Sequence, residues 1–130
     1  MTISERAYLI GTANNRQAII PCVISSRVVA GKGIPIAAIC GATLFLCRHG
    51  FLNHVKHTGD SLELFQSQQG YTGQDLYVAA QVVVDKGFIT ANETAAIEFA
   101  YHIFKTLKID SDKEIEKWFD NFKNGAVRTL

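Results

Sequence analysis

Residues 33–46 read GIPIAAICGATLFL, and this stretch decides the expected fold. Its first part, Ile34–Ile39, is apolar on both faces, which is typical of a parallel strand covered by helices on each side. Small residues follow Cys40 at once, and apolar residues then recur at helical spacing over Ala42–His49. The stretch therefore predicts a strand and a helix joined by a tight turn, with Cys40 at its apex.

Cys40 is the first candidate for a reactive residue. At a helix N-terminus, free backbone N–H groups and the helix dipole favour the thiolate form of a cysteine. The nucleophile elbow of hydrolases uses the same strand–turn–helix geometry. Cys22 and Cys47 are expected to be small buried hydrophobic residues. Three cysteines without a C-x-x-C pair predict reduced thiols rather than a disulfide framework or a zinc site.

Length and composition predict one globular domain spanning residues 1–130. A hydrophobic share of 48% and a charged share of 19% are ordinary for such a domain. The net charge of +1, with no basic cluster interleaved with aromatics, argues against nucleic acid as a partner. No apolar run reaches the roughly 18 residues of a membrane helix, and residues 1–6 lack the layout of a signal peptide. We therefore expect a cytoplasmic protein that binds no nucleic acid and no membrane.

The secondary-structure patterns on both sides of the elbow are weaker. Residues 1–15 have the weakest pattern, although residues 7–10 predict a short strand. Arg16–Val29 has the apolar spacing of a helix. After the elbow, residues 51–58 predict a loop leading into a short strand, and residues 59–75 predict a mixture of helix and loop.

The C-terminal half carries one hairpin signal and two helix-start signals. Tyr77–Val84 and Phe88–Ala91 are predicted strands joined by an Asp-Lys-Gly turn, in which Asp85 is expected to bond to its own turn. Capping boxes at Thr90–Glu93 and Ser111–Glu114 predict helices that begin there.

The order of these elements predicts an α/β layer fold. Strands that alternate with helices favour a mainly parallel sheet with helices on both faces. Ligands of such sheets bind beyond the carboxyl ends of the strands, and Cys40 lies at one of those ends. No phosphate-cradling motif or metal-ligand constellation stands out, so we expect no cofactor and no metal.

Three stretches, in this order, resemble the PfpI superfamily of intracellular protease I-like proteins. They are IAAICGAT (36–43), GFLNHVKHT (50–58) and VVVDKGFITA (82–91), the last followed by AAIEFA (95–100). The first is similar to the family's cysteine elbow, the second to the segment after the elbow helix, and the third to its late hairpin and helix. The resemblance extends over residues 16–109.

The resemblance implies a flavodoxin-like three-layer sandwich with a mainly parallel sheet, related to class I glutamine amidotransferase domains. It implies Cys40 as the nucleophile and the backbone N–H of Gly41 as one oxyanion donor, a role that needs only a main-chain group. Family members are usually longer, and their first strands and helix lie upstream, so the chain resembles an N-terminally truncated form. A sheet without its central strands exposes unpaired edges, so we expect a homodimer.

The partners of the cysteine are less well defined. His57 is the candidate general base, because a histidine after the elbow can exchange protons near neutral pH. His54 is a second candidate, and for both the alternative is a surface or structural role. The family's acid that contacts the cysteine lies upstream, and no residue here maps onto it. Asp60, Glu63 and Glu93 are acids that folding could bring near the cysteine, and their spacing selects none of them.

Two functions of different classes follow from these observations. The first is an enzyme whose cysteine attacks a carbonyl or acyl group of a small-molecule or peptide substrate, as a hydrolase (peptidase or amidase) or a glyoxalase- or deglycase-type enzyme. The second is a non-catalytic relative that serves as a structural, self-associating or thiol-oxidation-sensing stress protein, because oxidation needs a reachable thiolate but no complete catalytic set. The unmapped acid favours the second function.

Overall fold

The computed structural model describes residues 8–10 and 34–125. The predicted helix Arg16–Val29 and Cys22 lie outside the described residues.

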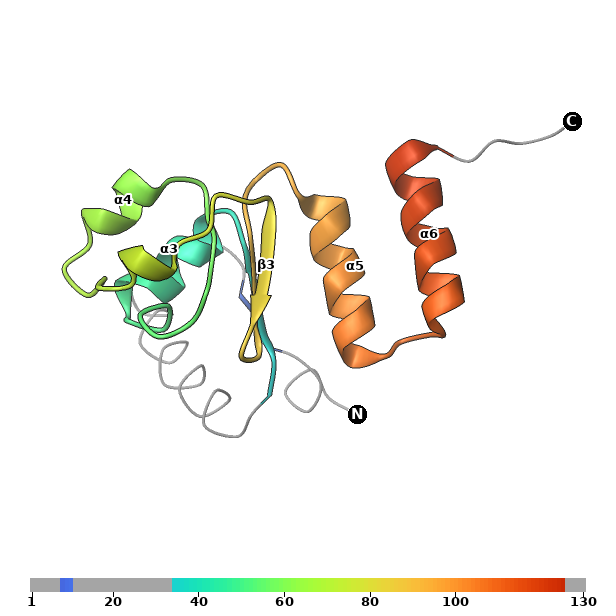
Figure 1. Cartoon of the computed structure of the whole chain (residues 1–130), viewed down its shortest axis with the longest axis horizontal. Coiled ribbons are helices and arrows are strands. Elements are labelled where there is room, and N and C mark those ends of the chain that lie inside the picture. The colour runs from blue at the N-terminus through green and yellow to red at the C-terminus, as the bar shows by residue number, and fades with distance from the viewer. Residues whose placement is uncertain (1–7, 11–33, 126–130) are drawn as a thin grey trace, which may run out of the picture.

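One sheet forms the centre of the fold (Figure 1). Its described strands are β1 (Tyr8–Ile10), β2 (Ile36–Ile39), β3 (Val82–Asp85) and β4 (Phe88–Ala91), and their order in the sheet is β1-β2-β4-β3. β2 runs parallel to both β1 and β4, whereas β3 is antiparallel to β4. The prediction of a mainly parallel sheet is confirmed for the described strands.

Helices cover both faces of this sheet (Figure 1). α3 (Gly41–Arg48) and α4 (Leu62–Gln66) lie on one side, and α5 (Ala96–Leu107) lies on the other. α6 (Asp112–Asn124) packs on the outside of α5, and the short 3₁₀ helix η1 (Gln74–Leu76) contacts α4. The described chain is therefore a helix–sheet–helix sandwich with an additional outer helix. None of the helices within residues 34–125 combines the length and the apolar character needed to cross a membrane.

The core lies between β2 and α3, where the sequence predicted a buried strand and an apolar helix face. Ile36 and Ala38 of β2 are 1% and 0% exposed, and Leu46 of α3 is 0% exposed. They pack with Phe65 of α4 in one hydrophobic cluster. Ala37 points to the opposite face of the strand and is also buried. β2 is thus apolar on both faces because both faces are covered.

The hairpin between β3 and β4 is confirmed, but its first strand is shorter than predicted. Lys86 and Gly87 have φ angles of 47° and 83°, as a two-residue type I′ turn requires. The strand begins at Val82 rather than at Tyr77. Tyr77 instead forms an isolated parallel bridge with His57, which ties the segment before β3 to the segment after α3.

Two polar side chains that were predicted to act locally bond to distant backbone instead. The Asp85 carboxylate accepts a hydrogen bond from the Lys56 N–H at 2.8 Å, so the expected bond to its own turn is wrong. Thr90 Oγ1 accepts a hydrogen bond from the Thr58 N–H at 2.9 Å inside the sheet. The capping box at 90–93 is therefore wrong, and α5 begins at Ala96.

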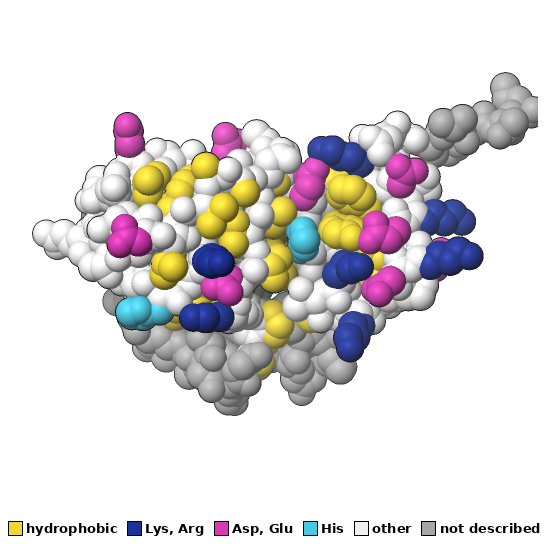
Figure 2. Space-filling view, in the orientation of Figure 1, with side chains coloured by type: hydrophobic (Ala, Val, Ile, Leu, Met, Phe, Trp, Pro, Cys, Tyr) yellow, Lys and Arg dark blue, Asp and Glu magenta, His cyan; other side chains and the backbone are white. Residues whose placement is uncertain are grey.

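α6 begins where its capping box predicted. The Ser111 hydroxyl accepts a hydrogen bond from the Glu114 N–H at 3.3 Å, which satisfies a free donor of the first turn. Trp118 packs against Phe104 of α5, with ring centroids 4.9 Å apart. Figure 2 shows charged side chains on both sides of a hydrophobic strip over these two helices.

Candidate active site

Cys40 occupies a strained turn between β2 and α3. Its φ and ψ angles are 57° and −126°, a conformation that non-glycine residues rarely adopt. The Cys40 N–H donates to the Ala91 carbonyl of β4 at 3.0 Å. The N–H and the hydroxyl of Thr43 donate to the Cys40 carbonyl at 3.0 and 2.6 Å. These bonds hold the residue in the predicted strand–turn–helix elbow, with an exposed side chain.

The surroundings of the Cys40 thiol correct the expectation that the elbow favours a thiolate. The thiol donates a hydrogen bond to the Asp60 carboxylate, and this bond is the largest of the causes that raise the pKa of Cys40. Partial desolvation and the negative charges of Asp60 and Glu93 raise the pKa further. A hydrogen bond from the Gly41 N–H lowers it, but the raising effects are stronger. The net effect is a pKa of Cys40 above its ordinary value, which favours the protonated thiol at neutral pH.

Asp60 reaches the elbow because its loop is tied to β4 and to the following segment. Its Oδ1 accepts a hydrogen bond from the Glu93 N–H at 3.0 Å. The preceding Gly59 is buried, and its carbonyl accepts a hydrogen bond from the Tyr77 hydroxyl at 3.1 Å. Thr58 binds β4 through its N–H. Sequence spacing could not select Asp60 among the candidate acids, because these bonds join residues that are 18 and 33 positions apart in the chain.

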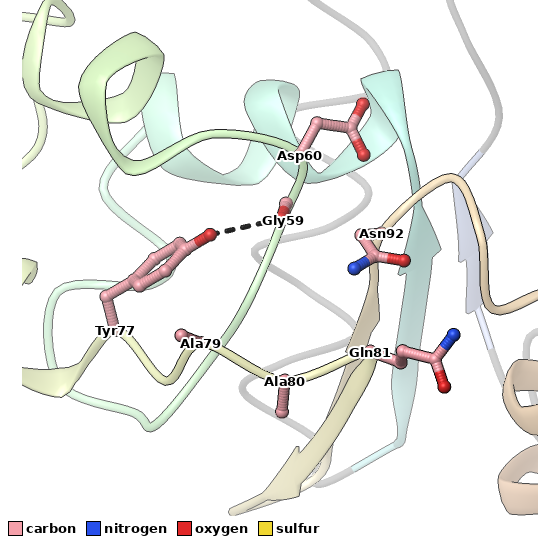
Figure 3. Close-up of a pocket in the computed structure, with 7 residues that line it drawn as sticks. All are labelled: Gly59, Asp60, Tyr77, Ala79, Ala80, Gln81 and Asn92. Carbon is pink, nitrogen blue, oxygen red and sulfur yellow. Dashed lines mark hydrogen bonds between the residues drawn. The ribbon is translucent and has the colours of Figure 1, made fainter.

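An open cleft of about 380 Å³ lies beside Asp60 (Figure 3). It is lined by Gly59, Asp60, Tyr77, Ala79, Ala80, Gln81 and Asn92. Asn92 directly follows Ala91, whose carbonyl binds the Cys40 N–H. Cys40 does not line the cleft, which borders the elbow through two of its lining residues: Asp60, the hydrogen-bond partner of the thiol, and Asn92, the residue after Ala91.

His57 is buried away from solvent and engaged through both ring nitrogens. Nδ1 lies 2.7 Å from the Val55 carbonyl, and Nε2 lies 2.7 Å from the Tyr71 hydroxyl. Because a carbonyl can only accept, Nδ1 carries the proton and Nε2 accepts from the tyrosine. Burial lowers the pKa of His57, in keeping with a neutral ring. The rings of Phe65 and Tyr77 complete its surroundings. This placement supports a structural role instead of the general-base role that the sequence suggested.

The other sequence candidates lie at the surface or in the core. His54 and Glu63 are exposed. Cys47 is fully buried as expected, and its thiol donates to the Phe65 carbonyl at 3.7 Å. Burial raises the pKa of Cys47 to about 12, so it is inert beside the exposed elbow cysteine. Within residues 8–10 and 34–125, no three side chains of His, Cys, Asp or Glu gather in a way that could hold a metal ion.

Comparison with known proteins places the chain in a family. Residues 20–106 match the model of the DJ-1/PfpI family. Two Bacillus subtilis (strain 168) proteins named "Uncharacterized protease YdeA" and "Uncharacterized protease YoaZ" are 44% and 36% identical to the chain, over 86 and 88 residues. The matches cover 66% and 67% of the chain, but only 44% and 42% of these relatives. The chain thus spans less than half the length of the curated relatives it matches.

Solved structures give the same result at the level of the fold. A thiJ/pfpI family protein from Bacillus anthracis has a TM-score of 0.86 and 25% sequence identity, covering 92% of the chain and 58% of that protein. The DJ-1 superfamily protein Atu0886 from Agrobacterium tumefaciens has a TM-score of 0.77 and 27% identity, covering 91% and 64%. The fold is therefore flavodoxin-like, as the resemblance implied. On the family match and these neighbours together, the chain belongs to the DJ-1/PfpI family.

Proposed function

We propose that the chain is a thiol enzyme of the PfpI type, in which Cys40 attacks a carbonyl or acyl carbon of a small-molecule or peptide substrate. The observation that carries this proposal is the exposed Cys40 thiol, held in a strained elbow and hydrogen-bonded to Asp60 beside an open cleft. The names of the two Bacillus relatives, both called proteases, support hydrolysis of an amide bond as the reaction.

In this proposal Asp60 is the proton acceptor that activates the thiol. Since the raised pKa keeps Cys40 protonated, the nucleophile forms only as its proton moves to the Asp60 carboxylate. The sulfur then bonds to the carbonyl carbon, and the Gly41 N–H donates to the developing oxyanion. Collapse of this intermediate breaks the carbon–nitrogen bond, and the leaving amine takes the proton from Asp60. Water then hydrolyses the thioester, with Asp60 accepting one of its protons and returning it to the sulfur.

The alternative of a thiol-oxidation sensor is less well supported. Reaction with peroxide requires a thiolate at physiological pH. The Asp60 carboxylate and its charge act against that form of Cys40. A base that takes the thiol proton during the reaction fits the observed contact better than a permanently ionised sulfur.

Self-association remains part of the proposal, with a second copy of the chain as the partner. Ile109, in the connection between α5 and α6, and Phe122, near the end of α6, are 49% and 62% exposed. The Phe122 ring packs on Trp118 with ring centroids 4.9 Å apart, and a contiguous exposed apolar surface of this kind favours a covering partner in solution. Light scattering at micromolar concentration tests this, and a monomeric mass contradicts it.

Matched serine variants test the enzymatic proposal. Cys40→Ser is expected to abolish turnover of a panel of peptidyl-aminomethylcoumarin, p-nitrophenyl ester and α-oxoaldehyde substrates. Cys47→Ser and Cys22→Ser are the controls and should keep the activity of the unmodified chain. Intact mass spectrometry with the ester substrate should show an acyl adduct on Cys40 alone. Equal turnover by Cys40→Ser and the unmodified chain contradicts the proposal.

A further inference from the structure

We infer that the cleft beside the elbow is a subsite for an uncharged carbonyl group. Asn92 Nδ2 donates the hydrogen bond that holds the carbonyl oxygen. The cleft selects against anionic groups. The inference rests on the proposed function, because it assigns the substrate group that lies next to Cys40. It adds a second donor to the Gly41 N–H and a charge preference to the site.

The orientation of the Asn92 amide is set by its neighbours. The N–H and the hydroxyl of Thr94 both donate to Asn92 Oδ1, at 3.0 and 2.6 Å. Gln81 Nε2 donates to the same Thr94 hydroxyl at 2.9 Å, which directs the hydroxyl proton toward Asn92. With its oxygen engaged on this side, the amide must present Nδ2 on the other.

Asn92 Nδ2 is a free donor at the cleft. Figure 3 shows this nitrogen turned toward the side of Gly59 and Ala80, while the oxygen points away from them. No hydrogen bond of this nitrogen is found among the described residues, whereas the oxygen accepts two. A fixed, half-buried donor without a partner in residues 34–125 is suited to a ligand acceptor such as a carbonyl oxygen.

The strand register places this donor beside the nucleophile. Ile39 of β2 is paired with Ala91 of β4, and the Cys40 N–H donates to the Ala91 carbonyl. Cys40 and Asn92 are therefore the next residues of two neighbouring parallel strands. Gly41 contributes its N–H from the β2 side and Asn92 its amide from the β4 side. Asparagine side chains and backbone N–H groups are the donor types that stabilise an oxyanion.

The charge of the cleft disfavours anionic ligands. Its lining residues include the Asp60 carboxylate and no Lys, Arg or His. Glu93, which raises the pKa of Cys40 through its charge, adds a second negative group nearby. A carboxylate on the ligand would be repelled by both groups and would find no cation among the lining residues. A carboxamide or a peptide carbonyl avoids this repulsion and still accepts from Asn92.

Two alkylating reagents of equal size and leaving group test the inference on the full chain. Iodoacetamide carries a neutral carboxamide and iodoacetate a carboxylate. The measured quantity is the rate of Cys40 alkylation by iodoacetamide divided by the rate with iodoacetate, read by peptide mass spectrometry. In the folded chain we expect this ratio to be about fivefold or more above its value in the same chain unfolded in urea. The iodoacetamide rate should also saturate with reagent concentration. An unchanged ratio without saturation overturns the inference.

Two isosteric variants, each read with a suitable pair of reagents, test the donor and the charge; Asn92→Asp also adds a negative charge, so it is read only with neutral reagents, on which this charge acts equally through the thiol. Asn92→Asp keeps the acceptor for Thr94 and removes the donor, so the iodoacetamide rate should fall about fivefold relative to methyl methanethiosulfonate, a neutral reagent without a carbonyl. Asp60→Asn keeps the acceptor for the Glu93 N–H and removes the charge. The rate of Cys40 alkylation by iodoacetate should therefore rise relative to the rate with iodoacetamide. If either variant fails to fold, the other variant and the rate ratio of the unmodified chain still decide. No change in either folded variant overturns the inference.

The inference and the proposed function fail in different ways. If the two alkylation rates of Cys40 have the same ratio in the folded chain as in the unfolded chain, the subsite is overturned. The test of turnover with the serine variants is unaffected by that result. Turnover that survives Cys40→Ser overturns the function, while the reagent ratio still measures the subsite. Cys40 that is unreactive toward all three reagents overturns both.

Discussion

At the scale of single residues, the state of Cys40 is decided by its neighbour in space and not by its place on a helix. The helix N-terminus offers the sulfur partial positive charge, through the Gly41 N–H. Asp60 presents a full negative charge and a hydrogen-bond acceptor to the thiol. The full charge outweighs the partial one, so the pKa of the thiol rises.

Asp60→Asn is expected to move the pH profile of Cys40 alkylation to lower pH. In the unmodified chain the rate should still be rising at pH values above the free-thiol pKa of about 8.5, because the pKa is raised. The carboxamide removes the charge that stabilises the thiol form, so more thiolate is present at each pH. Glu63→Gln, an exposed carboxylate on α4, is the matched control. A profile that Asp60→Asn leaves unchanged contradicts this assignment of the pKa shift.

Tyr71→Phe is expected to destabilise the fold without altering the site. Removing the hydroxyl leaves His57 Nε2 without a partner in the core, which costs about 1–3 kcal/mol of unfolding free energy. Urea denaturation measures this loss. The pH profile of Cys40 alkylation should stay the same, because His57 is assigned a structural role. A changed profile would return His57 to the list of candidate bases.

At the scale of elements, the sequence predicted the features that depend on neighbouring residues, but it did not predict those that depend on hydrogen bonds between distant segments. The helix after Cys40 begins within one residue of its predicted start, and the Ser111 cap is confirmed, because both depend on neighbours in sequence. The Thr90 capping box failed because a tertiary bond to Thr58, 32 residues away, replaced the local one. Asp60 was missed as the partner of Cys40 for the same reason. Its selection depends on how loops meet above the sheet, which spacing does not encode.

Gly59→Ala is expected to disturb the loop that delivers Asp60 to the elbow. A Cβ at this position would lie 2.3 Å from Phe65 Cζ and 2.9 Å from Thr43 Oγ1, both in buried side chains. Overpacking of this kind costs about 1–3 kcal/mol and shifts the backbone. Urea denaturation should show the loss, and the Cys40 pKa should fall as Asp60 withdraws.

The matched control is Gly87→Ala in the β3–β4 turn. Its Cβ meets nothing within 4 Å, but its φ of +83° makes alanine unfavourable by about 1–2 kcal/mol. This variant should lose comparable stability with no change in the Cys40 pKa. Equal shifts of the Cys40 pKa in both variants would mean that the pKa responds to general loosening of the fold and not to the position of Asp60.

At the scale of the whole molecule, the chain divides into a tightly packed centre and an outer helical layer. The residues of β2, α3 and β4 that form the centre include many with almost no exposure. α5 has no fully buried residue, and in α6 only Ile115 is buried. Figure 1 shows α6 outside α5 and away from the sheet. Elements with few buried contacts open at a lower free energy, so α6 should separate before the sheet unfolds.

Acid should release α6 first, and Glu98 should be part of the cause. The Lys123 ammonium donates to the Glu98 carboxylate between the two helices, and this bond lowers the pKa of Glu98 below its usual value of 4.5. A carboxylate with a lowered folded pKa contributes its full stability above pH 4.5 and loses it as the pH falls through the folded value.

Trp118 is the only tryptophan of the chain and lies on α6 against Phe104, so its fluorescence reports the separation of α6 from α5. In Glu98→Gln this helix contact no longer titrates. The change of Trp118 fluorescence with falling pH should therefore be shallower, and the α5–α6 contact should already be less stable at pH 7. The ion pairs of Lys105 with Asp112 and Glu116 are present in both proteins, so the difference between the two curves isolates Glu98. Identical curves for both proteins would show that the Lys123 contact does not hold the outer layer.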